Sequence, residues 1–406
     1  MTPSPASSPA LPALSALVSA HVTPSPVAWA QPAREASFNL WLARMAATHG
    51  FQTGSLRLAS ADASFRRYLR VDATDFQGGS YIIMDAPPSH ENCRPFVDVA
   101  HLMAQAGLNV PQVLDWDEPN GFLLLSDLGH QTMMQAMDRA NPQANHSAYM
   151  QAVDVLIAWQ VASQPGVLPP YDEALLRREL ELFPDWYIAR HRGIKVEGEV
   201  RTTLDAAFTH IVAHNLAWPS VYVHRDFMPR NLMAPTLVAS RTALPPREAN
   251  FGSAALREPR GGPSENSLAT SLGVLDFQDA VYGPITYDIA SLMRDAFLTW
   301  EEDFVLDITI RYWQKAKKAG LPVGNDFGEF YRGVEWMGLQ RHLKVAGIFA
   351  RLTLRDGKPQ YLADTPRFID YIRATCSRYR ELKPLLRLVD RIEGIEAATG
   401  FAYGRV

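Results

Sequence analysis

Two short polar segments, each directly after an apolar run, carry the residue types that phosphoryl transfer requires. In VHRDFMPRNLM, His224, Asp226 and Asn231 follow an apolar strand, and in LGVLDF, Asp276 ends another. Phosphoryl transfer needs a carboxylate beside the attacking hydroxyl, and Mg²⁺ prefers oxygen ligands from one or two side chains. We therefore predict that Asp226 is the catalytic base, that Asn231 and Asp276 bind Mg²⁺, and that His224 is structural.

The elements around these motifs predict an α+β fold with two lobes. Residues 34–49 have helical apolar spacing, and strand-like runs follow in SLRLAS, FRRYLRV and SYIIMDA. The helix PFVDVAHLMAQAG and the strands VPQVLDW and GFLLLSDLG complete a small, strand-rich N-lobe for nucleotide binding at residues 34–128. Helical periodicity dominates residues 129–406, which we assign to a larger C-lobe for catalysis and acceptor binding. Either motif alone also fits a simple polar loop, but both together in this setting favour a kinase.

Two segments differ from the rest in composition. Residues 1–33 are rich in Pro, Ala and Ser, and no Lys or Arg precedes their apolar run, so they predict a disordered tail rather than a signal peptide. Residues from about 236 to 271 are rich in Pro, Gly, Ser, Ala and Arg and lack periodicity. They predict a disordered insertion, with a lid over the bound substrate as the alternative.

The composition excludes several classes of partner. The formal net charge of −4 gives no concentrated basic surface for nucleic acid, and no run approaches the ~20 apolar residues that a membrane span needs. The two cysteines, Cys93 and Cys376, have no metal-binding spacing and suit a reducing compartment. We expect a cytoplasmic protein with no nucleic-acid or membrane partner.

In their order along the chain, these motifs resemble those of the aminoglycoside phosphotransferase and choline kinase family, which has a protein-kinase-like fold and uses ATP with Mg²⁺. That resemblance implies the same roles for Asp226, Asn231 and Asp276, and it gives Asp288 in YDIA a structural role near a helix N-terminus. A closer resemblance is to the bacterial anomeric sugar kinases of cell-wall recycling, which act on N-acetylmuramate and N-acetylglucosamine. The segments that carry it are SADASFRRYLRV, IIMDAPP, ENCRPFVDVA, HRDFMPRNLM, DFQDAVYGPITYDIASLMRD and GLQRHLKVAGIFARL.

The nucleotide site departs from the wider family. Met84 stands where a typical kinase carries the phosphate-binding lysine, and the first loop is poor in glycine. Strand alternation places Arg67 on the face of Leu69 and Val71, which we expect to point to the interlobe core. Arg67 is therefore the predicted substitute for the lysine, with Arg66 second, although both also fit a solvated surface. The remaining predicted nucleotide contacts are Ser60, Asp62 and Ser64 in the loop and Ser126, Asp127 and Leu128 at the hinge.

The acceptor sugar is expected to lie between the catalytic loop and the C-terminal helices. A bidentate arginine would suit the lactyl carboxylate of muramic acid. The basic candidates are Arg294, Arg341, His342 and Lys344, although Arg341 and Lys344 also fit the outer face of a long helix.

Three functions are compatible with these patterns. The first is an ATP- and Mg²⁺-dependent kinase for the anomeric hydroxyl of N-acetylmuramate or N-acetylglucosamine. The second is an aminoglycoside-type kinase, whose polycationic substrates would need an acidic pocket; the acidic residues of WEEDF are the local candidates. The third is a pseudokinase-like binding module, which Met84 and the glycine-poor loop would favour.

Overall fold

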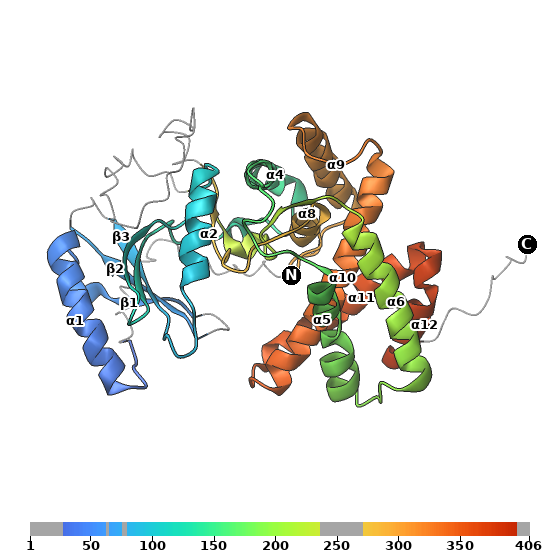
Figure 1. Ribbon diagram of the computed structural model, residues 1–406, viewed down its shortest axis with the longest axis horizontal. Helices are drawn as coiled ribbons and strands as arrows, with labels where there is room; N and C mark the ends of the chain where they lie inside the picture. The colour runs from blue at the N-terminus through green and yellow to red at the C-terminus, as the bar shows by residue number, and fades with distance from the viewer. Residues whose placement is uncertain (1–26, 62–64, 75–78, 236–270, 396–406) are drawn as a thin grey trace, which may run out of the picture. The chain divides into compact units, whose positions relative to one another are not determined.

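The structure, a computed structural model, describes residues 27–61, 65–74, 79–235 and 271–395 (Figure 1). Most of the predicted tail, nearly all of the predicted insertion, and the loop residues Asp62 and Ser64 lie outside these ranges. The chain divides into two compact units, Met1–Asn92 with Leu114–Asp127 and Cys93–Val113 with Leu128–Val406. The first unit differs from the predicted N-lobe because residues 93–113 group with the second.

The first unit is a five-stranded sheet covered by helix α1 (Pro32–His49) (Figure 1). Its strand order is β1-β2-β3-β5-β4. Strand β1 pairs with β2, β2 with β3, and β3 with β5, and all three pairs are antiparallel. All five strands overlap the runs predicted from the sequence, and β1, β2 and β4 extend one residue beyond them. Their bounds are Arg57–Ala61, Arg67–Asp72, Ser80–Asp85, Val113–Asp117 and Phe122–Ser126 for β1 to β5.

One face of this sheet packs against α1. Leu69 and Val71 of β2 are fully buried and join Phe38 and Trp41 of the helix in a single apolar cluster. Alternation therefore assigned Leu69 and Val71 to one face, as expected, but helix α1 covers that face. The expectation that they point to the interlobe core is wrong, because a helix from outside the strand run supplies their apolar partners.

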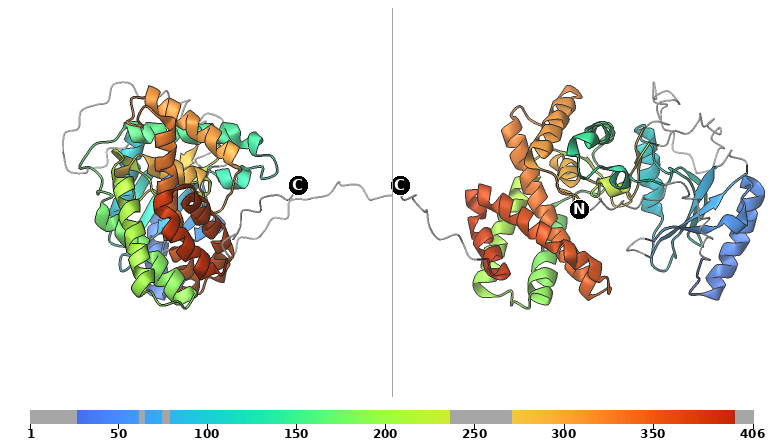
Figure 2. Two further views of the ribbon diagram at one scale, coloured as in Figure 1. Left: turned by 90° about the vertical axis from the view of Figure 1, so that its right-hand side faces the viewer. Right: turned by 180° about the vertical axis from the view of Figure 1, so that it is seen from behind.

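The second unit is mostly helical. Helix α10 (Phe327–Leu354) is buried along most of its length and contacts α6, α8 and α11 (Figure 2). Its N-terminus is capped by Asp326, whose side chain accepts a hydrogen bond from Glu329 N at 2.9 Å. The other helices are α2 (Arg94–Gln105), α3 (Met133–Ala136), α4 (His146–Val161), α5 (Glu173–Leu180), α6 (Gly198–Leu216), α8 (Thr286–Met293), α9 (Glu302–Lys318), α11 (Thr365–Arg378) and α12 (Lys383–Glu393).

The segment DEALLRRELELFPDWYIARH, residues 172–191, has helical periodicity throughout, but the structure divides it in two. Helix α5 ends at Leu180, and a π-helical segment follows at Phe183–His191. Pro184, at the start of that segment, has no N–H to donate, so a regular α-helical ladder cannot run through it. None of the described helices is long and apolar enough to cross a membrane.

Two short strand pairs of the second unit position the polar motifs. Strand β6 (Ser220–Val223) pairs antiparallel with β9 (Val281–Pro284), and β7 (Leu232–Met233) pairs with β8 (Gly273–Val274). The pairs bracket both motifs, because VHRDFMPRNLM runs from the end of β6 to β7 and LGVLDF contains β8. A Cβ at Gly273 would lie 2.8 Å from Leu128 Cδ1, so glycine allows Leu128 to pack directly on β8.

Candidate active site

The structure brings together the three predicted catalytic and metal-binding residues, all of which belong to the second unit. Asn231 Nδ2 donates to Asp276 Oδ2 at 3.2 Å and to the backbone oxygen of Asp226 at 2.9 Å. Leu275 N also donates to Asn231 O at 2.9 Å, which fixes the strand end that carries Asp276 beside the loop. The two motifs are thus one structural site, although 45 positions separate Asn231 from Asp276.

His224 connects the two motifs through its ring nitrogens. Its ring is buried, with Nε2 2.9 Å from Leu275 O and Nδ1 accepting from Asp226 N at 3.2 Å. A bond to a carbonyl oxygen requires Nε2–H, so Nδ1 is the unprotonated acceptor. Burial lowers the pKa of His224 to about 4, and the opposing effect of the Asp226 charge is smaller. A neutral histidine in this position holds the loop and cannot act as a proton donor near neutral pH.

Asp288 holds the catalytic loop through its backbone. The Asp288 carboxylate accepts hydrogen bonds from His224 N at 2.7 Å and Arg225 N at 3.0 Å. It was expected to satisfy donors near a helix N-terminus, and it does lie in the first turn of α8. However, its carboxylate is directed to the loop, and the N-cap residue of that helix, Ile285, makes no side-chain cap bond.

The backbone on both sides of the site is in an uncommon conformation. Arg225 has φ of 77° and Asp276 has φ of 65°, and they are the non-glycine residues with positive φ among those described. A left-handed conformation costs roughly 1–2 kcal/mol for a residue with a Cβ, and it persists where the surroundings fix it. Arg225 directly precedes Asp226, and Asp276 follows β8 and is itself a predicted metal ligand. The strained backbone therefore coincides with the predicted chemistry.

The donor set fits a hard divalent cation. Both hydrogen bonds of the Asn231 amide use Nδ2, which leaves Oδ1 outside them, and the carboxylate of Asp276 lies next to it. A carboxylate and an amide oxygen are the ligand types that Mg²⁺ takes alongside phosphates and water. In the described ranges, this site included, there is no group of three or more His, Cys, Asp or Glu side chains arranged to hold a metal.

Two of the predicted sugar-binding residues lie beneath the catalytic loop. Lys344 is buried and pairs with Glu179 Oε1 at 2.9 Å. Arg341 is also buried; its Nη1 donates to the backbone oxygen of Arg225 at 2.6 Å, and its guanidinium lies over the ring of Tyr287 at 4.9 Å. These contacts support a positioning role for both side chains, and a direct sugar contact by either stays a prediction.

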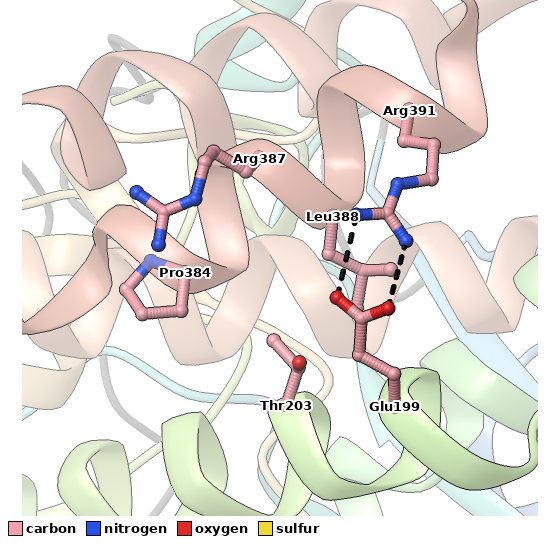
Figure 3. A pocket seen from close by; sticks show the side chains of 6 residues that line it. All are labelled: Glu199, Thr203, Pro384, Arg387, Leu388 and Arg391. Carbon is pink, nitrogen blue, oxygen red and sulfur yellow. Dashed lines mark hydrogen bonds and ion pairs between the residues drawn. The ribbon is translucent and has the colours of Figure 1, made fainter.

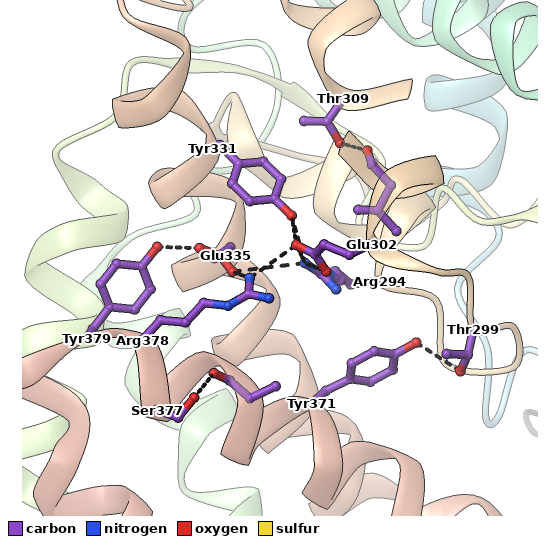
Figure 4. A network of polar contacts seen from close by, with 12 residues as sticks. Arg294, Thr299, Glu302, Thr309, Tyr331, Glu335, Tyr371, Ser377, Arg378 and Tyr379 are labelled. Carbon is purple, nitrogen blue, oxygen red and sulfur yellow. Dashed lines mark hydrogen bonds and ion pairs between the residues drawn. The ribbon is translucent and has the colours of Figure 1, made fainter. Parts of the chain in front are cut away.

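The other two, Arg294 and His342, line a cavity of about 290 Å³ between α10, α11 and the start of α9. Arg294 Nη2 bonds Glu302 at 3.1 Å and Tyr331 OH at 2.9 Å (Figure 4). Arg378 lies 3.1 Å from Glu302 and pairs with Glu335, a carboxylate that Tyr379 also contacts (Figure 4). The cavity is lined in full by Arg294, Trp300, Glu301, Glu302, Glu335, Gly338, His342, Asp370, Tyr371, Ala374, Thr375 and Arg378.

His342 contributes a buried imidazole ring to the lining of this cavity. Its Nε2 lies 3.2 Å from Arg294 O, its ring stacks on Tyr371 at 4.5 Å, and burial lowers its pKa to about 3. The neutral ring therefore carries its proton on Nε2. Nδ1 is buried and has no partner among the described residues.

His342 also makes stability depend on pH. Its pKa is lower in the folded state than in the unfolded chain, so the unfolded chain binds a proton first and stability is lost as the pH falls below about 6.5. Between pH 7.5 and pH 5 we expect wild type to lose about 2 kcal/mol relative to His342→Gln. Urea unfolding of both proteins would measure this. The difference at pH 8 gives the pH-independent packing cost, and a difference that stays constant down to pH 5 would contradict the expectation.

A second cavity of about 90 Å³ lies between α6 and α12 (Figure 3). Arg391 and Glu199 pair across it at 3.4 Å, and both side chains are exposed. It contains none of the predicted site residues.

Met84 and Arg67 lie on opposite faces of the first unit's sheet. Met84 faces Tyr68 across the β2–β3 pair, whereas Arg67 pairs with Asp85 on the face that α1 covers. Arg67 Nε lies 3.0 Å from Asp85 Oδ2, and its guanidinium stacks on Trp29 at 4.3 Å. Arg67 thus lies on the opposite face from Met84 and is paired with Asp85, so it does not take the place of a lysine at position 84. The alternation argument that predicted Arg67 as the phosphate-binding substitute no longer applies.

Two of the other predicted nucleotide contacts, Arg66 and Asp127, pair with residues of the first unit. Arg66 pairs with Glu91 at 3.0 Å, and Asp127 accepts from Arg70 Nε at 2.6 Å and from Ser80 Oγ at 2.6 Å. Ser126 ends β5 and is buried, while Ser60 lies in β1.

Two acidic residues of the second unit were missed in the sequence. Glu179 is buried against the loop, and no local pattern on α5 distinguishes it from a surface glutamate. Asp295 is fully buried, and one of its oxygens has no partner among the described residues. Burial raises the pKa of Asp295 to about 6, although backbone bonds from Phe297 and Leu298 oppose this. Its position in SLMRD beside Arg294 was the available signal.

Comparison with known proteins shows the family to which the chain belongs. The family model described as "Phosphotransferase enzyme family" matches residues 55–236 and 269–324, more than half of the chain. The chain is 47% identical to the N-acetylmuramate/N-acetylglucosamine kinase of Pseudomonas aeruginosa, with 84% of this chain and 89% of the relative covered. It is 45% identical to the protein of the same name from Neisseria meningitidis, with 86% and 94% covered.

Solved structures show the same fold at low sequence identity. A choline/ethanolamine kinase family protein from Mesorhizobium loti has a TM-score of 0.52 at 12% identity, with 88% of this chain and 99% of that chain covered. The GDP complex of wild-type aminoglycoside 2'-phosphotransferase-IIIa has a TM-score of 0.51 at 13% identity, with 85% and 99% covered. The predicted α+β, protein-kinase-like fold is confirmed.

Fold and motifs together define a protein-kinase-like phosphotransferase that transfers to small molecules. Within that class, the chain belongs to the phosphotransferase enzyme family that also contains the aminoglycoside phosphotransferases. The resemblance predicted from the sequence is confirmed, including its closer branch of curated amino-sugar kinases.

Proposed function

We propose that this protein is an ATP- and Mg²⁺-dependent kinase that phosphorylates the anomeric hydroxyl of N-acetylmuramate, N-acetylglucosamine or both, in peptidoglycan recycling. The observation that carries the proposal is the joined site of Asp226, Asn231 and Asp276 in a chain with 47% identity to a curated amino-sugar kinase. A cytoplasmic location suits the two buried free thiols of Cys93 and Cys376.

In the proposed reaction, the sugar's anomeric hydroxyl lies against the Asp226 carboxylate. The oxygen bonds to the γ-phosphorus of ATP, the bond from that phosphorus to the β–γ bridging oxygen breaks, and the hydroxyl proton passes to Asp226. Asn231 and Asp276 would hold Mg²⁺, which supplies positive charge beside the phosphates. His224 and Asp288 keep the loop backbone in place during the transfer.

Two regions are proposed to complete substrate binding. On the sugar side, Arg294 and His342 line one cavity, so we favour them over Arg341 and Lys344, which do not line it. For the nucleotide, Ser60, Asp62, Ser64, Arg66, Ser126, Asp127 and Leu128 remain the proposed contacts.

The acidic lining of the cavity favours one alternative. Glu301, Glu302, Glu335 and Asp370 outnumber Arg294 and Arg378 there, which would suit a polycationic aminoglycoside. A single assay separates the two functions: ATP consumption by the purified protein with N-acetylmuramate, N-acetylglucosamine or a kanamycin-like aminoglycoside, with the product located by phosphorus NMR. A sugar 1-phosphate is the expected product. Turnover with the aminoglycoside alone would overturn the proposal, and Mg²⁺–ATP binding without turnover on any acceptor would favour a binding module.

A further inference from the structure

A buried carboxylate lies directly under the catalytic loop. Glu179 of α5 accepts from Tyr171 OH at 2.5 Å and Gln340 Nε2 at 2.9 Å on Oε2. Its Oε1 pairs with Lys344 at 2.9 Å and with the guanidinium of Arg225. Four donors from three separate segments, two of them on α10, thus converge on one side chain that is only 5% exposed.

The network keeps Glu179 charged. Burial raises its pKa, but Lys344 and Arg225 together lower it to about 2. A buried ion pair contributes little net stability compared with apolar packing, because removing both ions from water is costly. Stability alone therefore does not explain why the chain places these charges beneath the loop.

Arg225 is the residue that this carboxylate controls. It precedes Asp226 directly and has the left-handed φ of 77°. Its backbone N–H donates to Asp288, its backbone oxygen accepts from Arg341 at 2.6 Å, and its guanidinium pairs with Glu179. The peptide that leads into Asp226 is therefore fixed from three sides. Glu179 is the charged partner of the Arg225 side chain, which also donates to Asp279 O at 3.4 Å.

We propose that Glu179 is a positioning residue: through Arg225 it holds the left-handed backbone conformation that directs the Asp226 carboxylate at the acceptor hydroxyl. The inference rests on the proposed role of Asp226 as base. Glu179 itself does not touch a substrate, and its effect is on the geometry of transfer. Loss of the anchor should lower kcat and leave substrate affinity nearly intact.

The test is Glu179→Gln, which keeps the shape of the side chain and removes the charge. We expect kcat to fall by roughly 10- to 100-fold, the scale of a misplacement of about 1 Å, with KM for ATP and for the amino sugar changed less than about threefold. Glu173→Gln is the matched control, because Glu173 lies on the same helix in an exposed pair with Arg177. It should stay within about twofold of wild type.

A double-mutant cycle separates positioning from general damage. Because Glu179 would act through Arg225, the kcat of Glu179→Gln combined with Arg225→Met should match that of the worse single variant rather than the product of both losses. If Glu179→Gln fails to fold, Glu179→Met with Lys344→Met removes opposite charges together and should fold with the same loss of kcat. Lys344→Met alone should lose less, because the Glu179–Arg225 pair remains.

Three results would overturn the inference: unchanged kcat in a folded Glu179 variant, a loss confined to KM, or multiplicative losses in the cycle. The proposed function fails differently, since wild type itself would then produce no sugar 1-phosphate.

Discussion

Asp226→Asn should lower kcat for amino-sugar phosphorylation by about 10²- to 10⁴-fold, the usual contribution of a general base. The amide has nearly the same size as the carboxylate but cannot accept the hydroxyl proton. The hydrogen bonds of residue 226 to His224 and Asn231 use its backbone N–H and oxygen, so the substitution leaves them intact. Initial rates of ADP release with saturating sugar and ATP would measure the loss.

The matched control is Asp279→Asn. Asp279 is an exposed aspartate of the neighbouring segment, and its backbone oxygen, not its side chain, lies near Arg225. Its kcat should remain within about twofold of wild type. Asp226→Asn with more than a tenth of wild-type turnover would show that another group accepts the proton. Equal Mg²⁺–ATP binding by both variants would show that the loss lies in transfer.

The fold and the order of the motifs followed from local patterns. Strand alternation and helical spacing depend on neighbouring residues, so β2, β3 and α1 were placed within a few residues of their observed bounds. The joined site was also predictable, because the strand ends that carry Asn231 and Asp276 must pair to satisfy their backbone groups.

What could not be read from the sequence depends on partners far along the chain. Alternation showed that Arg67 shares a face with Leu69, but not that α1 covers this face and that Asp85 binds the guanidinium. Glu179 and Lys344 are far apart in the sequence, yet they form one buried ion pair. Sequence spacing gives no signal for such a contact, so the ion pair of Lys344 beneath the catalytic loop could not be predicted.

Asp288 illustrates the same limit at close range. A carboxylate in the first turn of a helix predicts a contact with that helix's own N-terminus. The side chain instead spans 64 positions of sequence to reach His224 N, because the β6–β9 pair brings the start of α8 against the loop. The role in stabilising backbone donors was predictable, but the identity of the donors was not.

Asp288→Ala is therefore expected to destabilise the second unit by roughly 3–5 kcal/mol, since it leaves two buried backbone N–H groups, those of His224 and Arg225, without an acceptor. Equilibrium urea unfolding, followed by tryptophan fluorescence, would measure the change. Asp172→Ala is the matched control: Asp172 accepts a single bond from Leu175 N at the exposed start of α5, and its loss should cost about 1 kcal/mol.

The same variant tests whether loop order and catalysis are linked. Without Asp288, Arg225 keeps its anchors to Glu179 and Arg341 but loses the acceptor that fixes its N–H, so its left-handed conformation is no longer enforced from both ends of the peptide. At a temperature where Asp288→Ala remains folded, we expect faster amide exchange at residues 224–226 together with a lower kcat. Destabilisation with an unchanged kcat would mean that Asp288 supports the fold alone, and that the left-handed turn before Asp226 is maintained by the side-chain anchors.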